Sequence, residues 1–434
     1  MIGVLRNPTY RALFSAQVIA LLGTGLLTVA LGLLAFELAG DAAGSVLGTA
    51  LTIKMVAYVG VAPLVAAIVD RLPKKVVLVG ADVVRLAIAL LLPFVSEAWQ
   101  IYVLVFVLQS ASATFTPAFQ SLIPTVLPEA KDYTRALALS RAAYDLEALL
   151  SPAIAALLLT VVSYDNLFVG TAIGFAASAV LVLFAAIPAH LGDGAASTFW
   201  ERLPTGAKVF ARTPGLRFLL ATNVVVAAGT ALVLVNSVVY AKSVFGLGDA
   251  ALAITLGAYG VGSLLVAVNI PWIVDRIGVT RTMLTGVVIV LVGLAAAIAV
   301  TVLAVAAATG WWALLATWVL LGAGTSLINT PSSRLLADAS TPANRNLVYT
   351  AQFAFSHACF LVTYPLAGWI GAASMPAAVI ALFVIAVAGA DTARAVRAHA
   401  IRGDHYWESP GRAPQEPPTP SAEHERPGPG TRAR

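Results

Sequence analysis

This chain of 434 residues is poor in charge. Asp, Glu, Lys and Arg together make up 11% of its residues and hydrophobic residues make up 59%, whereas soluble domains carry about 25% charged residues. Too few polar side chains are present to cover a water-exposed surface of this size. The shortage of charge therefore excludes an ordinary soluble protein and predicts a membrane protein.

Cysteine and nucleotide-binding motifs are also scarce. Cys359 is the single cysteine, which excludes a disulfide within the chain and leaves no cysteine pair to bind a metal. The sequence has no Gly-x-x-x-x-Gly-Lys-Ser/Thr phosphate loop, so we expect no ATP-driven activity. We predict no cofactor, no resident metal and no nucleic-acid partner.

Long apolar runs occupy most of the chain instead. A hydrocarbon core of about 30 Å requires roughly 20 apolar residues in a helix. Twelve stretches meet this length, and they define an all-α membrane protein. Their ranges are 12–36, 46–69, 76–95, 100–122, 135–162, 166–190, 217–243, 250–273, 281–305, 312–334, 346–370 and 374–396.

The positions of Lys and Arg predict the orientation. Apart from Lys54 and Lys242, these residues lie at the amino end, in every second gap between the stretches, or in the carboxyl tail. Cytoplasmic loops retain basic residues, so we expect both termini in the cytoplasm and the protein in the inner, or plasma, membrane. The opposite gaps, which contain no Lys or Arg, lie around Asp41, Glu97, Asp165, Asp249, Ala308 and Ser374.

An internal repeat divides the chain. Four features of the first six stretches recur 205 to 214 residues later: Asp70-Arg71 as Asp275-Arg276, Pro117 as Pro331, Pro128 as Pro342, and Pro152 as Pro365. Parallel repeats about an axis along the membrane normal are typical of secondary transporters, with the site between the halves. We predict a six-helix half over 1–190 and a second over 217–402.

The segments outside these halves have different compositions. Residues 191–216 repeat Phe199, Leu203, Ala207 and Phe210 at roughly helical spacing among basic residues. This pattern favours a cytoplasmic linker helix at the membrane surface. Residues 403–434 are rich in proline and polar residues, and we expect a disordered cytoplasmic tail because the segment has too little apolar area to fold alone.

Charged residues inside the spans are candidates for ion coupling, because a charge at the bilayer centre costs about 2.5 to 3.5 kcal/mol. Arg141 and Asp145 lie four residues apart on one helix face and can neutralise each other. Glu147 lies on the opposite side of that helix, and we predict that it is the main proton-coupling residue.

Two further residues have alternative interpretations. Lys54 lies in the second stretch and pairs with Glu147, as a coupling or purely structural ion pair, or reaches the outer headgroups. His357 is near the middle of the eleventh stretch and is suited to proton or metal binding, although a lone histidine is also common as a packing residue. Asp82 and Arg85 are expected to pair with each other.

The loop after the second stretch carries a family resemblance. Its sequence, Asp70-Arg71-Leu72-Pro73-Lys74-Lys75, is similar to the signature of the major facilitator superfamily, and Asp275 and Arg276 repeat part of it. The resemblance covers Arg6 to Arg397. It implies that Asp70, Arg71, Lys74, Lys75, Asp275 and Arg276 form a conformational latch, although the basic residues alone would also enforce orientation.

The same resemblance implies a central cavity lined by the first, fourth, seventh and tenth stretches. The polar residues there are uncharged, which suits an amphipathic or cationic organic compound, although each hydroxyl also has a packing interpretation. These candidates are Gln17, Thr24, Gln109, Ser110, Ser112, Asn223, Asn236, Thr325, Ser326 and Asn329.

Narrower similarities leave the substrate open. Residues 202–217 and 115–128 resemble the bacterial branch with siderophore and macrolide exporters, whereas residues 132–147 resemble members associated with nickel resistance. We expect a monomeric secondary transporter that exports a small molecule in exchange for protons across the lipid bilayer. Divalent-metal efflux through Asp145, Glu147 and His357 is the alternative. A membrane sensor or anchor that moves no solute is a third, and we do not expect an enzyme.

Overall fold

The described part of the protein is entirely helical. The computed structural model describes residues 2–61, 72–187, 199–303, 307–338 and 345–402. In the first half, the main helices are α1 (Pro8–Ala39), α2 (Ala43–Val56), α4 (Lys74–Leu91), α5 (Ala98–Val126), α6 (Ala130–Leu158) and α7 (Asp165–Phe184). In the second half they are α9 (Pro214–Val239), α10 (Asp249–Ile277), α11 (Val279–Val302), α12 (Ala307–Asp338), α13 (Arg345–Pro365) and α15 (Met375–Arg402).

Each predicted stretch except the second coincides largely with one of these helices, and the all-helical membrane fold is confirmed. In the second stretch, 46–69, α2 and the π-helical segment η3 (Ala57–Val61) cover residues 46–61, and residues 62–69 lie outside the described residues. By length and apolarity, ten stretches of the described residues could cross a membrane, one of them a continuous run from Pro8 to Gly60 that holds both α1 and α2. The charged helix α6 is not among the ten. The count of twelve crossings thus stays a prediction.

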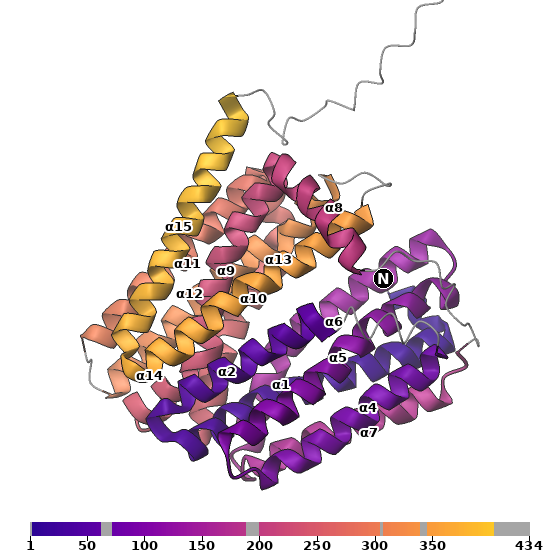
Figure 1. Ribbon diagram of the computed structural model, residues 1–434, viewed down its shortest axis with the longest axis horizontal. Coiled ribbons are helices and arrows are strands. Elements are labelled where there is room, and N and C mark those ends of the chain that lie inside the picture. The colour runs from indigo at the N-terminus through magenta and orange to yellow at the C-terminus, as the bar shows by residue number, and fades with distance from the viewer. Residues whose placement is uncertain (1, 62–71, 188–198, 304–306, 339–344, 403–434) are drawn as a thin grey trace, which may run out of the picture.

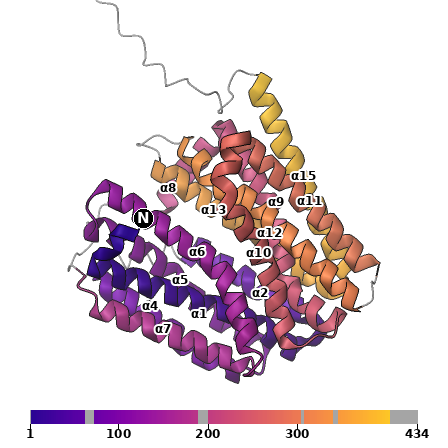
Figure 2. The same ribbon diagram turned by 180° about the vertical axis from the view of Figure 1, so that it is seen from behind.

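The helices form two bundles. In the first half α7 packs against α1 and α4, and α4 also packs against α5; in the second half α12 packs against α10 and α11, and α15 against α9. Figure 1 shows the first bundle in indigo to magenta and the second in pink to yellow, and Figure 2 shows the same division from behind.

Local sequence signals set the helix ends. Asn7 caps α1 by accepting a hydrogen bond from the Tyr10 backbone N–H at 3.1 Å, and Pro8 occupies the first turn. At the other end Gly40 has φ 51°, a left-handed conformation that glycine adopts without steric cost. The long α1 therefore begins and ends where the sequence places a cap and a glycine.

The two halves touch near one end of the bundle. The helix α2 packs there against α13 and the π-helical segment η6 (Leu366–Ile370). A side chain at Gly48 would have its Cβ 2.8 Å from the Tyr364 carbonyl oxygen and 2.9 Å from the Gly368 Cα. The Trp369 indole N–H donates to the Thr49 hydroxyl at 2.9 Å. Glycine therefore allows backbones of the two halves to meet almost directly.

The predicted linker helix is present as α8 (Phe199–Arg212). It packs on α13, where the buried Phe210 ring meets Phe355 edge to face at 5.2 Å between centroids. Both ribbon views place α8 beside α13 (Figures 1 and 2). The linker helix is thus attached to the second half, and Lys208 and Arg212 lie on its exposed side.

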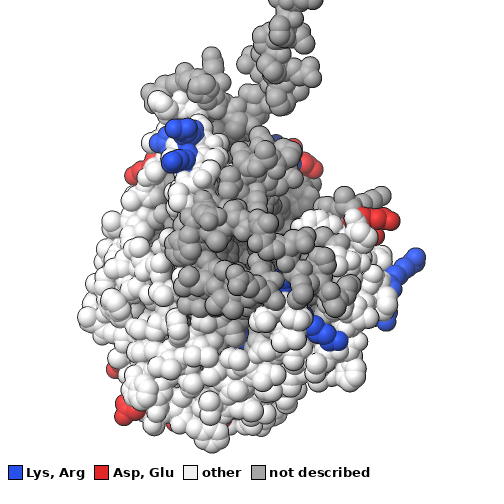
Figure 3. All heavy atoms as spheres, turned by 45° about the vertical axis from the view of Figure 1, so that its right-hand side comes forward, with Lys and Arg blue, Asp and Glu red and all other residues white. Residues whose placement is uncertain are grey.

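Apolar atoms dominate the outer surface. Large hydrophobic side chains are exposed on most long helices, including Leu157, Phe184, Trp272 and Val268. Figure 3 shows a broad white flank between a blue patch at the top of the view and a red one near the bottom. Such a belt is what a lipid-facing surface requires, because hydrocarbon cannot hydrate charged groups.

The contact at Gly48 predicts a stability defect. We expect Gly48→Ala to lower the apparent melting temperature in detergent, because the new methyl group must push α2 away from η6 at a cost of about 1–3 kcal/mol. Tryptophan fluorescence during heating measures this. Gly80→Ala in α4 is the control, since its Cβ would meet no atom within 4 Å. Equal melting of Gly48→Ala and the wild type would contradict the tight contact.

Candidate functional site

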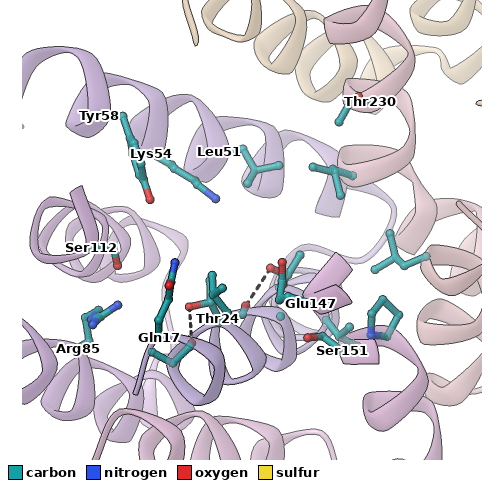
Figure 4. Close-up of a pocket in the computed structure, with 18 of the residues that line it drawn as sticks. Gln17, Thr24, Leu51, Lys54, Tyr58, Arg85, Ser112, Glu147, Ser151 and Thr230 are labelled. Atoms are coloured by element: carbon teal, nitrogen blue, oxygen red, sulfur yellow. Dashed lines mark hydrogen bonds between the residues drawn. The ribbon is translucent and has the colours of Figure 1, made fainter. Parts of the chain in front are cut away.

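A cavity of about 360 Å³ lies between the two halves (Figure 4). In the first half α1, α2, α4, α5 and α6 contribute to its wall, and in the second half α9 and α10 do. Its polar lining residues are Gln17, Thr24, Thr28, Lys54, Tyr58, Arg85, Ser112, Glu147, Ser151, Thr230 and Tyr259. The volume is within the range of small-molecule sites.

Glu147 lies on the cavity side of α6, where this helix crosses α1. Glu147 and Ser151 are four residues apart and hence on the same helix face. A Cβ at Gly25 of α1 would lie 2.1 Å from Ser151 Cβ and 2.7 Å from a Glu147 carboxylate oxygen. The missing side chain of Gly25 therefore provides the space that lets α6 hold the carboxylate at the cavity.

Lys54 is the cationic group on the α2 side of the cavity. Its ammonium lies 5.9 Å from the centre of the Tyr58 ring and interacts electrostatically with Glu147. Figure 4 shows Lys54 and Glu147 on opposite sides of the open space. Lysine carries a compact charge on a flexible stem.

Arg85 of α4 is a second cation in the wall, and it has a local partner. It forms an ion pair with the fully buried Asp82, which also accepts a hydrogen bond from the Ser178 hydroxyl at 2.7 Å. The guanidinium lies 4.4 Å from the Phe115 ring centre and 4.6 Å from that of Phe175. Carboxylate and aromatic faces together stabilise this buried charge, as the spacing of Asp82 and Arg85 predicted for the pair.

The second half presents hydroxyl groups to the same cavity. The Tyr259 hydroxyl lies 3.2 Å from the Thr230 hydroxyl and 2.9 Å from that of Thr325. The Thr325 hydroxyl also donates to the Gly322 carbonyl at 3.0 Å. Among the lining residues that the structure describes, the charged ones all belong to the first half, so the two walls differ in chemistry.

The predicted cavity residues fall into two groups. Gln17, Thr24 and Ser112 line the cavity; Gln17 accepts a hydrogen bond from Ser140 at 3.0 Å, and the buried Ser112 hydroxyl has no hydrogen-bond partner among the described residues. The structure places the others outside the lining. These are the buried Gln109, Asn223, Asn236, Thr325 and Ser326, the half-buried Ser110, and the exposed Asn329.

Some of these outlying residues have structural contacts. The Asn236 amide donates to the Ala367 carbonyl at 3.1 Å and so links α9 to η6. Ser110 donates to the Phe106 carbonyl at 2.7 Å, and Ser326 lies 3.3 Å from the Thr330 hydroxyl. Each of these two hydroxyl groups finds its partner within its own helix, Ser110 at a backbone carbonyl and Ser326 at a side chain. Bonding of Ser and Thr within their own helix is common in apolar helices.

The other residues predicted to couple protons are His357, Arg141 and Asp145. His357 lies outside the cavity lining; its Nδ1 is 2.7 Å from the Phe353 carbonyl oxygen, and its ring stacks on Tyr58 at 5.7 Å. The side chains of Arg141 and Asp145 lie outside the described residues. The described residues contain no group of three or more His, Cys, Asp and Glu side chains suited to a metal ion.

The structure describes four of the six residues predicted to form the latch. Asp70 and Arg71 lie outside the described residues. Lys75 donates to the Ala185 carbonyl at 3.1 Å, and Lys74 lies in the first turn of α4. Asp275 and Arg276 are exposed at the end of α10, with the Arg276 guanidinium 4.4 Å from the Trp272 ring centre. The latch role stays a prediction.

Six polar lining residues were predicted from the sequence neither as cavity residues nor as coupling residues: Thr28, Tyr58, Arg85, Ser151, Thr230 and Tyr259. Tyr58 and Arg85 share helical spacing with predicted residues, since Tyr58 follows Lys54 by four and Arg85 follows Asp82 by three. Thr230 and Tyr259 had no such signal. Only the packing of α9 and α10 against the first half brings them to the cavity.

Comparison with known proteins gives a family match. The family model described as "Major Facilitator Superfamily" matches residues 13–300 and 219–423. Among curated proteins, "Macrolide efflux protein A" of Streptococcus pyogenes is 26% identical over 219 residues, 49% of this chain and 53% of that protein. The Enterococcus faecalis protein of the same name is 28% identical over 38% of this chain and 52% of its own. The chain thus spans about half the length of the curated relatives it matches.

Solved structures share the fold at low identity. A mutant of the nucleoside transporter NupG superposes with a TM-score of 0.69 at 16% identity, covering 89% of this chain and 99% of that chain. A bacterial homolog of the human lysosomal transporter Spinster, described as inward-facing and unoccupied, gives 0.68 at 12% identity over 94% and 99%. At these identities the likeness shows the fold alone.

The close approach at Gly25 predicts a coupled pair of substitutions. We expect Gly25→Ala to destabilise the protein because the methyl group overlaps Ser151. Ser151→Gly in that background should restore part of the loss, since it removes both overlapping atoms. Thermal unfolding of the two single variants and the double variant measures the coupling. Strictly additive effects would contradict direct contact of α1 and α6 at this point.

Proposed function

Since the chain belongs to the Major Facilitator Superfamily and is a multi-pass membrane transporter, we propose that it exports a small amphipathic or cationic organic compound in exchange for protons, by alternating access. The observation that carries the proposal is the carboxylate of Glu147 in the wall of a cavity between the two halves. An intramembrane carboxylate beside a substrate-sized space is the arrangement that couples a proton to a solute.

The charges around Glu147 support an exchange at one site. An ionised carboxylate needs a nearby cation in this apolar region, and Lys54 meets that need while the cavity is empty. A proton or a cationic group of the substrate neutralises the same carboxylate. Because both compete for one group, binding of the substrate releases the proton, which is the basis of an exchange.

Alternating access requires two halves that separate at one end while they close at the other. The packing of α2 against η6, and that of α6 against α10, where a Cβ at Gly257 would lie 3.7 Å from Pro152 Cβ, join the halves on one side of the cavity. The positions of basic residues predict that this is the outer side. We therefore propose that in this conformation the cavity is closed toward the outer side of the membrane.

The proposed direction of transport rests on the relatives, and the proposed substrate class rests on the residues that line the cavity. The curated relatives carry the name "Macrolide efflux protein A", which favours export for this chain too. The cavity combines aromatic rings and aliphatic side chains with the Glu147 carboxylate and the cationic side chains of Lys54 and Arg85, of which Arg85 is paired with Asp82. Its apolar part is suited to an organic molecule with an apolar body. No observation on the described residues favours a divalent metal ion as the cargo.

A proton gradient provides enough free energy for this task. One elementary charge moved through 100 mV releases about 2.3 kcal/mol, and about 1.4 kcal/mol corresponds to a tenfold concentration ratio. Exchange of one proton for one neutral molecule moves one net charge per cycle and would hold a gradient of about 40-fold. Exchange of one proton for one monovalent cation moves no net charge and is driven by the pH difference alone, about tenfold per pH unit.

The test removes the titratable group. We expect Glu147→Gln in proteoliposomes to abolish proton movement driven by tetraphenylphosphonium, because the amide cannot bind and release a proton. A pH-sensitive dye inside the vesicles measures the movement. Glu129→Gln is the control, since Glu129 is exposed before α6 and its side chain makes no capping bond. Unchanged proton movement in Glu147→Gln would remove Glu147 from the mechanism.

A further inference from the structure

A chain of three hydroxyl groups leads from the cavity wall into the second half. It runs from Thr230 on α9 through Tyr259 on α10 to Thr325 on α12. Thr230 and Tyr259 line the cavity, whereas Thr325 is buried behind them. Each of the three groups has only one hydrogen to donate, so the donors and acceptors of the whole chain can be assigned.

The assignment begins at the buried end. Thr325 donates its hydrogen to the Gly322 carbonyl, because a carbonyl oxygen can only accept. Thr325 must then accept from the Tyr259 hydroxyl at 2.9 Å. Tyr259 has no second hydrogen, so it accepts from Thr230 at 3.2 Å.

The direction of these hydrogen bonds determines whether Thr230 can donate to a ligand in the cavity or only accept from it. The Thr230 hydrogen is committed to Tyr259, and within the described residues Thr230 makes no hydrogen bond to a backbone carbonyl. The Thr230 oxygen can therefore only accept a hydrogen bond from a ligand in the cavity that this residue lines. A serine or threonine hydroxyl usually adapts as donor or acceptor, but this one has a fixed polarity.

The first half also supplies an acceptor, the carboxylate of Glu147. The ammonium of Lys54, which interacts with that carboxylate, is a resident example of the group that fits there. Each wall of the cavity thus contributes an acceptor, and the acceptor of the first half is a carboxylate whose resident cation is Lys54.

From this pairing of acceptors we infer that Thr230 makes the site selective for protonated amines, which carry at least one N–H, over quaternary ammonium ions of the same size and charge. This inference rests on the proposed function for the choice of an organic cation. The Thr230 oxygen binds the N–H of the amine, while Glu147 provides the charge attraction common to both classes. A quaternary ion has no hydrogen to donate and leaves Thr230 without a partner.

The experiment compares two probes that differ by one methyl group. They are N,N-dimethyl-3-phenylpropylamine, protonated at neutral pH, and its trimethylammonium analogue. Equilibrium dialysis against the full-length protein in nanodiscs, corrected with empty nanodiscs, gives both dissociation constants. We expect the wild type to bind the amine about tenfold more tightly, as one hydrogen bond from a charged donor allows.

Variants in the hydroxyl chain test its polarity. Thr230→Val should weaken binding of the amine about tenfold and leave the quaternary probe unchanged, and Thr230→Ser should retain the preference. Thr325→Val changes no lining residue. It removes the acceptor of the Tyr259 hydrogen, which then turns to Thr230, and Thr230 turns its own hydrogen to the cavity. The preference for the amine should therefore fall in Thr325→Val although Thr230 is intact.

Several results would overturn the inference. They are equal binding of both probes by the wild type, an equal loss for both probes in Thr230→Val, an unaltered preference in Thr325→Val, or no binding of either probe. These readouts depend on equilibrium binding alone. Unchanged proton movement in Glu147→Gln would instead count against the proposed function and leave the probe preference standing.

Discussion

The constraint that governs this protein is the high cost of an unsatisfied charge in hydrocarbon. It confines the charged residues to helix ends and to a few buried sites. Two of these sites are the Asp82–Arg85 pair, enclosed by Phe115 and Phe175, and the Lys54 and Glu147 groups at the cavity. The first site is neutral within itself, whereas the second faces a space that a solute can enter.

Close backbone approach is the second requirement, and glycine meets it at two points. At Gly25 it lets α6 bring Glu147 against α1, and at Gly48 it lets α2 meet η6 of the other half. The first contact positions the Glu147 carboxylate at the cavity, and the second joins the two halves. A transporter needs both, because a carboxylate affects transport only if the bodies around it close on the solute.

Helix positions and the membrane class were predictable because they depend on local composition. Glu147 and Lys54 were also detectable, since a charge within an apolar run stands out in any arrangement. Asn236 and Thr325 show the limit of such reasoning. Both are polar residues in predicted cavity helices, yet Asn236 bonds to η6 and Thr325 lies behind Tyr259. A polar side chain within a span gives no indication of which neighbour will satisfy it.

The sequence by itself determined the all-helical membrane fold, the repeat of two halves and the positions of the costly charges, because hydrophobicity and spacing act within single helices. Only the tertiary structure decided that Lys54 and Glu147 face one cavity, that Arg85 is enclosed by two phenyl rings, and that the hydroxyl groups of Thr230, Tyr259 and Thr325 form one hydrogen-bonded chain. These relations join helices distant in the chain, and they depend on the crossing points of those helices. Gly25 and Gly48 fix two of these crossing points, because a Cβ atom at either position would overlap the neighbouring helix.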